Sequence, residues 1–251
     1  MDRDQLKLSS FAVAALEEIT DLEHSKLVRT FRTLFFQPGS LTNDYLRGQR
    51  RSLLGPVKIY LTLFAISFLL YTFHRPTAVY DVSTIIAQDS SGIYQSLLTN
   101  AAKEAHLSES AAIVGVNARW RSYINVTQAL YPLGLAILLQ LIYIGTGRYF
   151  VEHLIFALHF NSVAFGVIIL LWPIYAVIGV QTLTLAYGIT TVVSLLLPFI
   201  WLLIAVRRVY RQGWWPSVIK SVILETGYLV MGLVLTFLTL GAALAVVARS
   251  H

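Results

Sequence analysis

Five long apolar runs constrain the fold of this sequence more than any other feature. A run of about 20 apolar residues can cross the hydrocarbon core of a bilayer as an α-helix. Only 13% of the residues are charged, against about 25% in a typical soluble domain, so water is a poor solvent for most of the chain. We therefore expect an all-α, polytopic integral membrane helix bundle, with spans at about 56–73, 124–146, 158–179, 183–206 and 222–247.

The segments outside these runs predict two polar regions and an orientation. Residues 1–55 precede a transmembrane domain at 56–251, and residues 74–123 form a loop long enough to hold helices, with Ser108 as a predicted N-cap. With a cytoplasmic N-terminus, 14 of the 19 Lys and Arg residues lie on the cytoplasmic side. Positively charged loops tend to stay in the cytoplasm. We therefore expect an N-in, C-out chain whose loop 74–123 is extracytoplasmic.

The N-terminal region contains a predicted basic amphipathic helix that Pro38-Gly39 ends. Its apolar arc consists of Leu27, Val28, Phe31, Leu34 and Phe35. Such a helix can lie on the inner leaflet or pack against the protein's own spans, and the pattern fits both. Arg47, Arg50 and Arg51 follow just before the first span. They are candidates for binding lipid headgroup phosphates, although anchoring of the cytoplasmic side also explains them.

The segment 148–160 places ionisable residues beside an apolar run. On a helix, Arg148, Glu152 and His159 share one face, while His153 lies about 100° away. Three interpretations stay open. Arg148 and Glu152 form a structural ion pair while His159 bonds another helix; or the face lines a substrate or proton path; or Glu152 and His159 contribute to a metal site.

Glu225 is the other carboxylate within a predicted span. It could reach the cytoplasmic interface, pair with Lys220 or Arg208, or act as an intramembrane counter-ion for a cation. The same span carries small residues that would permit close helix packing or self-association, namely Gly227, Gly232, Gly241, Ala242 and Ala245.

Several classes of function find no support in the sequence. The chain has no cysteine, which excludes disulfides, thiolate catalysis and Cys-ligated zinc. It has no P-loop, no dinucleotide fingerprint and no nucleophile elbow, so we expect no cofactor. The net charge is +6, but no basic run with interleaved aromatic residues forms a soluble module, so we expect no nucleic-acid partner.

Two segments resemble an uncharacterised bacterial family of polytopic membrane proteins, known only as a domain of unknown function. One is LFFQPGSLTNDYLRGQRRSLLGP at 34–56, and the other is YFVEHLIFALHFNSVAF at 149–165. The resemblance implies a multi-pass protein of the bacterial inner membrane and supplies no activity. Many members carry an N-terminal Cys-x-x-Cys zinc ribbon, which this chain lacks. The architecture is also similar to that of the Yip family of membrane-trafficking proteins, and such a likeness does not transfer function.

These observations predict a non-enzymatic protein that binds lipid or a partner, or supports transport. Its partners would be the bilayer with its anionic headgroups, and a second copy or another membrane protein. The alternatives are a metal-dependent intramembrane enzyme acting on a lipid, and a proton-coupled secondary transporter using Glu152 or Glu225. The predicted polar focus comprises Arg148, Glu152, His153, His159 and Glu225.

Overall fold

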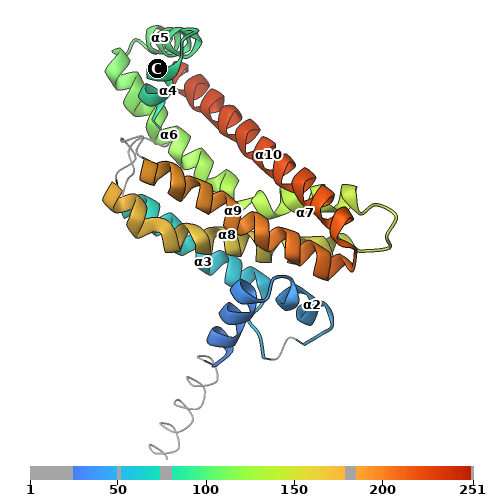
Figure 1. Cartoon of the computed structure of the whole chain (residues 1–251). Coiled ribbons are helices and arrows are strands. Elements are labelled where there is room, and N and C mark those ends of the chain that lie inside the picture. Colours follow the sequence, from blue (N-terminus) through green and yellow to red (C-terminus); the bar gives the residue numbers. More distant parts are fainter. Residues whose placement is uncertain (1–24, 50–51, 74–80, 179–184, 250–251) are drawn as a thin grey trace, which may run out of the picture.

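A computed structural model describes residues 25–49, 52–73, 81–178 and 185–249 (Figure 1). This described part is helical and contains no strand. A first helix covers residues 25–36. The others are α2 (Ser40–Leu46), α3 (Pro56–Phe73), α4 (Val82–Gln88), α5 (Ile93–Glu104), α6 (Glu109–Ala129), α7 (Tyr131–Ile142), α8 (Phe150–Ile178), α9 (Leu185–Tyr210) and α10 (Trp214–Ala248). The predicted all-α class is confirmed for the described residues.

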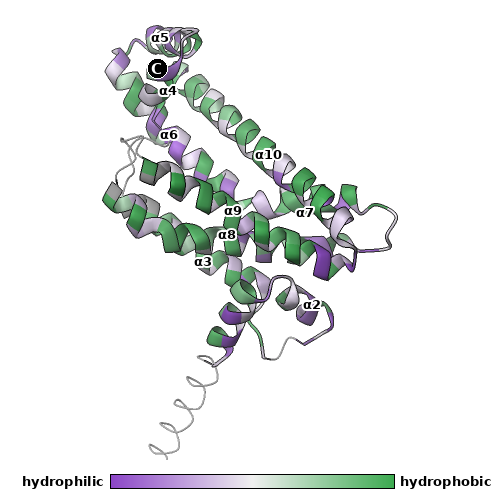
Figure 2. Cartoon of the chain, viewed as in Figure 1, coloured by the Kyte–Doolittle hydropathy of each residue, from purple (hydrophilic) through white to green (hydrophobic). Residues whose placement is uncertain are grey.

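Long apolar helices make this a membrane protein with three to four candidate spans in the described residues. Three helices qualify alone, over Phe150–Val177, Gly188–Tyr210 and Trp214–Ala248. The pair α6 and α7 qualifies together as one span that bends by 46°. The apolar part of α3, Pro56–Leu70, is shorter. Figure 2 shows apolar residues along α3, α8, α9 and α10, with polar residues gathered around α2 and the junction of α9 and α10.

The bend between α6 and α7 divides the predicted second span, and Pro132 explains it. Pro132 lies in the first turn of α7 and has no N–H to donate back to α6. The carbonyl groups at the end of α6 therefore need another donor. The Tyr60 hydroxyl on α3 supplies it, lying 3.2 Å from the Gln128 oxygen and 3.1 Å from the Ala129 oxygen. A neighbouring helix thus supplies a donor to the Gln128 oxygen, which the proline leaves free, and to the Ala129 oxygen beside it.

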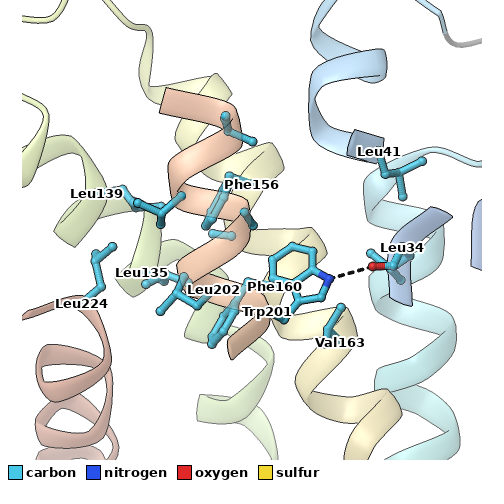
Figure 3. Packing of buried hydrophobic residues seen from close by; sticks show 14 of the residues in the cluster. Leu34, Leu41, Leu135, Leu139, Phe156, Phe160, Val163, Trp201, Leu202 and Leu224 are labelled. Atoms are coloured by element: carbon cyan, nitrogen blue, oxygen red, sulfur yellow. Dashed lines mark hydrogen bonds between the residues drawn. The ribbon is translucent and has the colours of Figure 1, made fainter. Parts of the chain in front are cut away.

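The helices form two apolar cores. In the first, α8 packs against α3, α7 and α9, and its Phe156 and Phe160 surround Trp201 of α9 (Figure 3). The second, which we call the cap, joins α4, α5 and α6 to the last turns of α10 around Trp120 and Leu98. The cap falls largely within the predicted loop 74–123, and the predicted N-cap Ser108 is confirmed, since its hydroxyl accepts from the Ala111 N–H at 3.3 Å.

Residues 25–49, which we call the collar, pack on the sides of α8 and α9. Leu34 is fully buried, and Phe31 and Phe35 are partly buried against the same core, whereas Leu27 and Val28 are exposed. The Trp201 indole N–H donates to the Leu34 carbonyl oxygen at 2.7 Å (Figure 3). Full burial of one leucine side chain contributes about 2 kcal/mol. The apolar arc therefore packs in large part on the protein's own helices.

A sharp turn at Gly39 lets the collar fold back against α9. Gly39 has φ +77°, in the left-handed region that favours glycine. A Cβ at this position would lie 3.0 Å from both the Cα and the carbonyl oxygen of Ala205, so only glycine fits so close to the backbone of α9. Arg208 of α9 then donates to the Pro38 carbonyl oxygen at 2.8 Å and to the Ser40 hydroxyl at 2.7 Å. These contacts place α2 beside the start of α8.

Candidate functional site

Arg148, just before α8, is held in place from two sides. Its guanidinium donates to Oε2 of Glu152 at 2.9 Å, and this is an i, i+4 ion pair in which both side chains are about one-quarter exposed. A second guanidinium N–H donates to the Val209 carbonyl oxygen at the end of α9, at 2.6 Å. The sequence spacing predicts the first contact. The second joins residues 61 positions apart, so the guanidinium bridges two helices.

Two stacked tyrosine rings form a platform under this arginine. Tyr143 and Tyr210 have ring centroids 3.7 Å apart and planes within 8° of parallel. The Arg148 guanidinium carbon lies 4.8 Å from the Tyr210 centroid, and the Lys220 ammonium lies 4.0 Å from the Tyr143 centroid. Cations attract the faces of aromatic rings. The platform therefore fixes both cations and orients the guanidinium of Arg148.

His153 supports the platform from the buried side. Its side chain is fully buried, and its Nδ1 lies 2.7 Å from the Tyr210 hydroxyl. The imidazole is also nearly parallel to the Tyr210 ring, with centroids 5.6 Å apart. His153 therefore does not reach the same surface as Glu152. It lies behind Tyr210 and holds that ring in position.

Three arginines surround a surface pocket of about 400 Å³ at this end of the bundle. Arg47 comes from the end of α2, Arg148 from the start of α8 and Arg211 from the end of α9. Glu152 is the one carboxylate among the lining residues, which also include Asn43, Leu46 and Val209. We call this the basic pocket. Its ionisable side chains sum to a net charge of +2, and planar guanidinium groups match phosphate and carboxylate oxygens with paired hydrogen bonds.

Two of the three guanidinium groups are available to a ligand. In the described part of the chain, the side chains of Arg47 and Arg211 make no hydrogen bond or ion pair, and both residues are exposed. Arg148 uses two of its five N–H groups on Glu152 and Val209. The arrangement therefore combines one oriented guanidinium with two unpaired ones, as expected of a site for an oxyanion.

His159 lies deeper and does not join the basic pocket. It is seven residues beyond Glu152, or about 10 Å along the helix axis. It is fully buried, and its Nδ1 lies 2.9 Å from the hydroxyl of Thr42 in α2. Its Nε2 has no partner within the described residues. The residues that were predicted to share one face thus have two separate roles. Arg148 and Glu152 form an ion pair, whereas His159 contacts Thr42 and docks the collar on α8.

Glu225 lies elsewhere, on α10. Its two predicted partners make other contacts, since Lys220 covers Tyr143 and Arg208 binds the collar. The Oε2 atom of Glu225 is buried and has no hydrogen-bond partner within the described residues. One turn further along, the Tyr228 hydroxyl donates to Oδ1 of Asn161 on α8 at 2.9 Å.

The remaining predicted groups divide between the described and undescribed parts of the chain. Arg50 and Arg51 lie outside the described residues. Among the described residues, no three His, Asp or Glu side chains are grouped so that they could hold a metal ion. Of the small residues on α10, Gly227 faces Leu138 and Gly232 faces Tyr131, whereas no atom lies near Gly241. Gly241, Ala242 and Ala245 are exposed.

Comparison with known proteins gives one family match. The family described as "Protein of unknown function (DUF3667)" matches residues 24–68, which cover the collar and most of α3. The first of the two segments that resemble an uncharacterised family, 34–56, lies wholly within this range, and the second, 149–165, lies outside it. No curated protein and no solved structure matches the chain. The match supports an uncharacterised family and assigns no activity.

Proposed function

We propose that the chain crosses the membrane five times, with the N-terminus in the cytoplasm. The spans would be α3, the bent pair α6–α7, α8, α9 and α10. The 18 residues of α3 would extend about 27 Å, and flanking residues can adjust for so small a mismatch. The 35 residues of α10 would extend about 52 Å, long enough to cross and still join the cap.

The distribution of charge and aromatic residues supports this orientation. The collar and the C-terminal end of α10 lie at opposite ends of the molecule (Figure 1). The arginines of the basic pocket lie at the collar end, as the positive-inside rule requires. Trp214 and Trp215 are exposed at the start of α10, and exposed tryptophans are typical of the headgroup level. The bacterial inner membrane, and the Yip-like architecture, stay predictions from the resemblances.

The missing cysteines allow a direct test of the orientation. Gln49→Cys at the collar end and Lys103→Cys in the cap each introduce a single thiol at an exposed position. In intact spheroplasts, a membrane-impermeant maleimide should label Lys103→Cys, and it should label Gln49→Cys only after lysis. The reverse pattern would contradict the orientation, and equal labelling of both in intact spheroplasts would contradict a crossing by α3, the one proposed span between the two sites.

We propose further that the basic pocket binds the anionic headgroup of a membrane lipid. The observation that supports this is the convergence of Arg47, Arg148 and Arg211, from three different helix ends, on one pocket. The two unpaired guanidinium groups would donate to headgroup oxygens, while Arg148 would position the ligand. This function needs neither a cofactor nor a metal ion.

Native mass spectrometry of the detergent-purified chain, titrated with an anionic phospholipid, tests the proposal. Arg47→Gln should weaken lipid binding by tenfold or more, since a hydrogen bond to a charged group contributes roughly 1.5–3 kcal/mol. Arg32→Gln is the matched control, because Arg32 is an exposed collar arginine that does not line this pocket. Equal weakening in both variants would reduce the effect to general surface charge and contradict the proposal.

Proton-coupled transport is a second candidate, favoured by the unpaired Oε2 atom of Glu225 within α10. An uncompensated carboxylate inside a membrane is costly and often marks a proton or ion path. Proteoliposomes with an entrapped pH dye test this. Glu225→Gln should abolish any proton flux that the wild-type chain mediates, and an unchanged flux would remove Glu225 from that role.

A further inference from the structure

The charge of the basic pocket exceeds what a common phosphodiester headgroup can neutralise. Three arginines and one glutamate line it, giving a net charge of +2. A phosphodiester carries one negative charge, and a phosphate monoester carries close to two above its second pKa of about 6. Asp44 is on α2 but is not among the lining residues. The second positive charge therefore stays uncompensated with a diester and is compensated by a monoester.

The backbone of Arg211 indicates that this second charge has a function. Arg211 has φ +51°, in the left-handed region, where the Gln212 N–H closes the helix end by donating to the Arg207 carbonyl oxygen at 3.3 Å. Glycine is the usual residue at such a position, because it adopts this conformation without strain. A strained residue at a helix end is a reason to ask what its side chain does. Here the side chain lines the basic pocket and has no partner in the described part of the chain.

We infer that the basic pocket selects a phosphate monoester over a phosphodiester, with Arg211 supplying the charge that discriminates between them. This inference rests on the proposed headgroup binding and deepens it. Arg148, oriented by Glu152, Val209 and the Tyr210 ring, binds the phosphate oxygens that both ligand classes share. Arg47 also binds oxygens that both ligand classes share, and Arg211 binds the additional charged oxygen, which a diester replaces with an ester link. The shared chemistry is a terminal phosphate, either on a lipid or on a water-soluble compound.

The test compares two short-chain lipids that differ only in this respect, dioctanoyl phosphatidic acid and dioctanoyl phosphatidylglycerol. Binding to the full detergent-purified chain is measured at pH 7.5 and at pH 5. Phosphatidic acid should bind at least about tenfold more tightly at pH 7.5, a factor that electrostatic complementarity readily supplies. The preference should shrink at pH 5, where the monoester takes up a proton. Inorganic phosphate, as a competitor, separates the two sources: competition at a similar concentration indicates a soluble phosphate compound, and weak competition indicates a lipid.

The diester lipid is the experimental control for the other ionisable groups near the pocket. Glu152, Asp44, Lys220 and the buried His153 are ionisable groups on the elements around the pocket, and each of them acts on both lipids, whereas proton uptake by the monoester alters the binding of one. A preference that is the same at both pH values would therefore contradict the inference.

Arg211→Gly provides a variant that should fold at least as well as the wild type. Glycine relieves the left-handed strain, so the midpoint of thermal unfolding should rise or stay unchanged. Phosphatidic acid binding should fall to the level of phosphatidylglycerol, which should itself change little. If the wild type binds both lipids equally, the monoester inference fails while headgroup binding stands. If neither lipid binds, or if Arg47→Gln leaves both affinities unchanged, headgroup binding itself fails.

Discussion

Gly39→Ala tests whether the collar docks on α9 as closely as described. Two costs add at this position. The first is the left-handed backbone, with φ +77°, which costs an L-residue roughly 1–2 kcal/mol, less about 0.4–1 kcal/mol regained because alanine restricts the unfolded chain. The second is steric. The new methyl group would meet the Cα and carbonyl oxygen of Ala205 at 3.0 Å and a methyl group of Val209 at 3.1 Å.

The steric cost cannot be relieved by a side-chain rotation, because two of the three contacts are backbone atoms of α9. The collar must move instead, which strains the bond from Trp201 to the Leu34 carbonyl and the contact between Thr42 and His159. Overpacking of this kind costs typically 1–3 kcal/mol. We therefore expect Gly39→Ala to lower the free energy of unfolding by about 2–4 kcal/mol in total.

Gly48→Ala is the matched control. Gly48 has φ +85°, and a Cβ there would meet no atom within 4 Å. This variant incurs the backbone cost alone, about 1 kcal/mol or less. The difference between the two variants isolates the docking term, at about 1–3 kcal/mol.

Thermal unfolding in detergent, followed by circular dichroism and tryptophan fluorescence, measures the difference. At about 2–4 °C per kcal/mol for a chain of this size, Gly39→Ala should unfold roughly 4–16 °C below wild type and clearly below Gly48→Ala. Trp201 is one of the five tryptophans of the chain, and its burial lets its share of the emission report on the collar contact. Equal shifts for the two variants would refute the close approach of Gly39 to Ala205, and an unshifted Gly39→Ala would refute the turn itself.

Two further substitutions test other contacts of the fold. Tyr60→Phe removes the hydroxyl that donates to the two carbonyl groups at the end of α6, and we expect the free energy of unfolding to fall by about 1–3 kcal/mol. Thermal unfolding in detergent measures this change, and an unchanged midpoint would mean that water satisfies these carbonyl groups. In the cap, partial burial raises the pKa of the Asp81 carboxyl, but hydrogen bonds from Ser83 and Asn117 outweigh it and leave the pKa below 3.8. The ionised carboxylate therefore stabilises the cap above pH 3.8, and this stabilisation is lost as the pH falls through the lowered pKa. Circular dichroism should show a loss of cap structure in acid for the wild type, and this acid transition should be absent in Asp81→Asn.

The features that could be predicted from the sequence are those set by local spacing. The apolar runs mark the long helices, Ser108 caps α6, and the i, i+4 spacing of Arg148 and Glu152 forms the ion pair. Each depends on residues within a few turns of one another. The apolar arc of the collar also follows from helical periodicity. The surface against which this arc packs does not follow from periodicity, because a membrane surface and the protein's own helices offer equivalent apolar contacts.

The features that could not be predicted depend on which helices become neighbours. Arg148 binds the carbonyl oxygen of Val209, and His159 meets Thr42 across 117 positions of sequence. Periodicity assigns His159 to the face of Glu152, but it cannot show that the collar covers this part of α8. In the sequence, Arg211 is one of several arginines that are predicted to be cytoplasmic, and its left-handed backbone has no local signature. The division of the second span was visible only as Pro132, which can kink a helix or end it.

The family match and the basic pocket share residues of the collar. The match covers the collar but not the arginines at 148 and 211. The collar in turn depends on α8 and α9, since His159, Trp201 and Arg208 hold it in place. Arg47, at the end of α2, therefore reaches the pocket only while the collar is docked. A variant that releases the collar, such as Gly39→Ala, should accordingly weaken phosphate binding even though residue 39 does not line the pocket. This links the stability of the collar to the chemistry of the site, and a destabilised variant with unchanged lipid affinity would show that the two are independent.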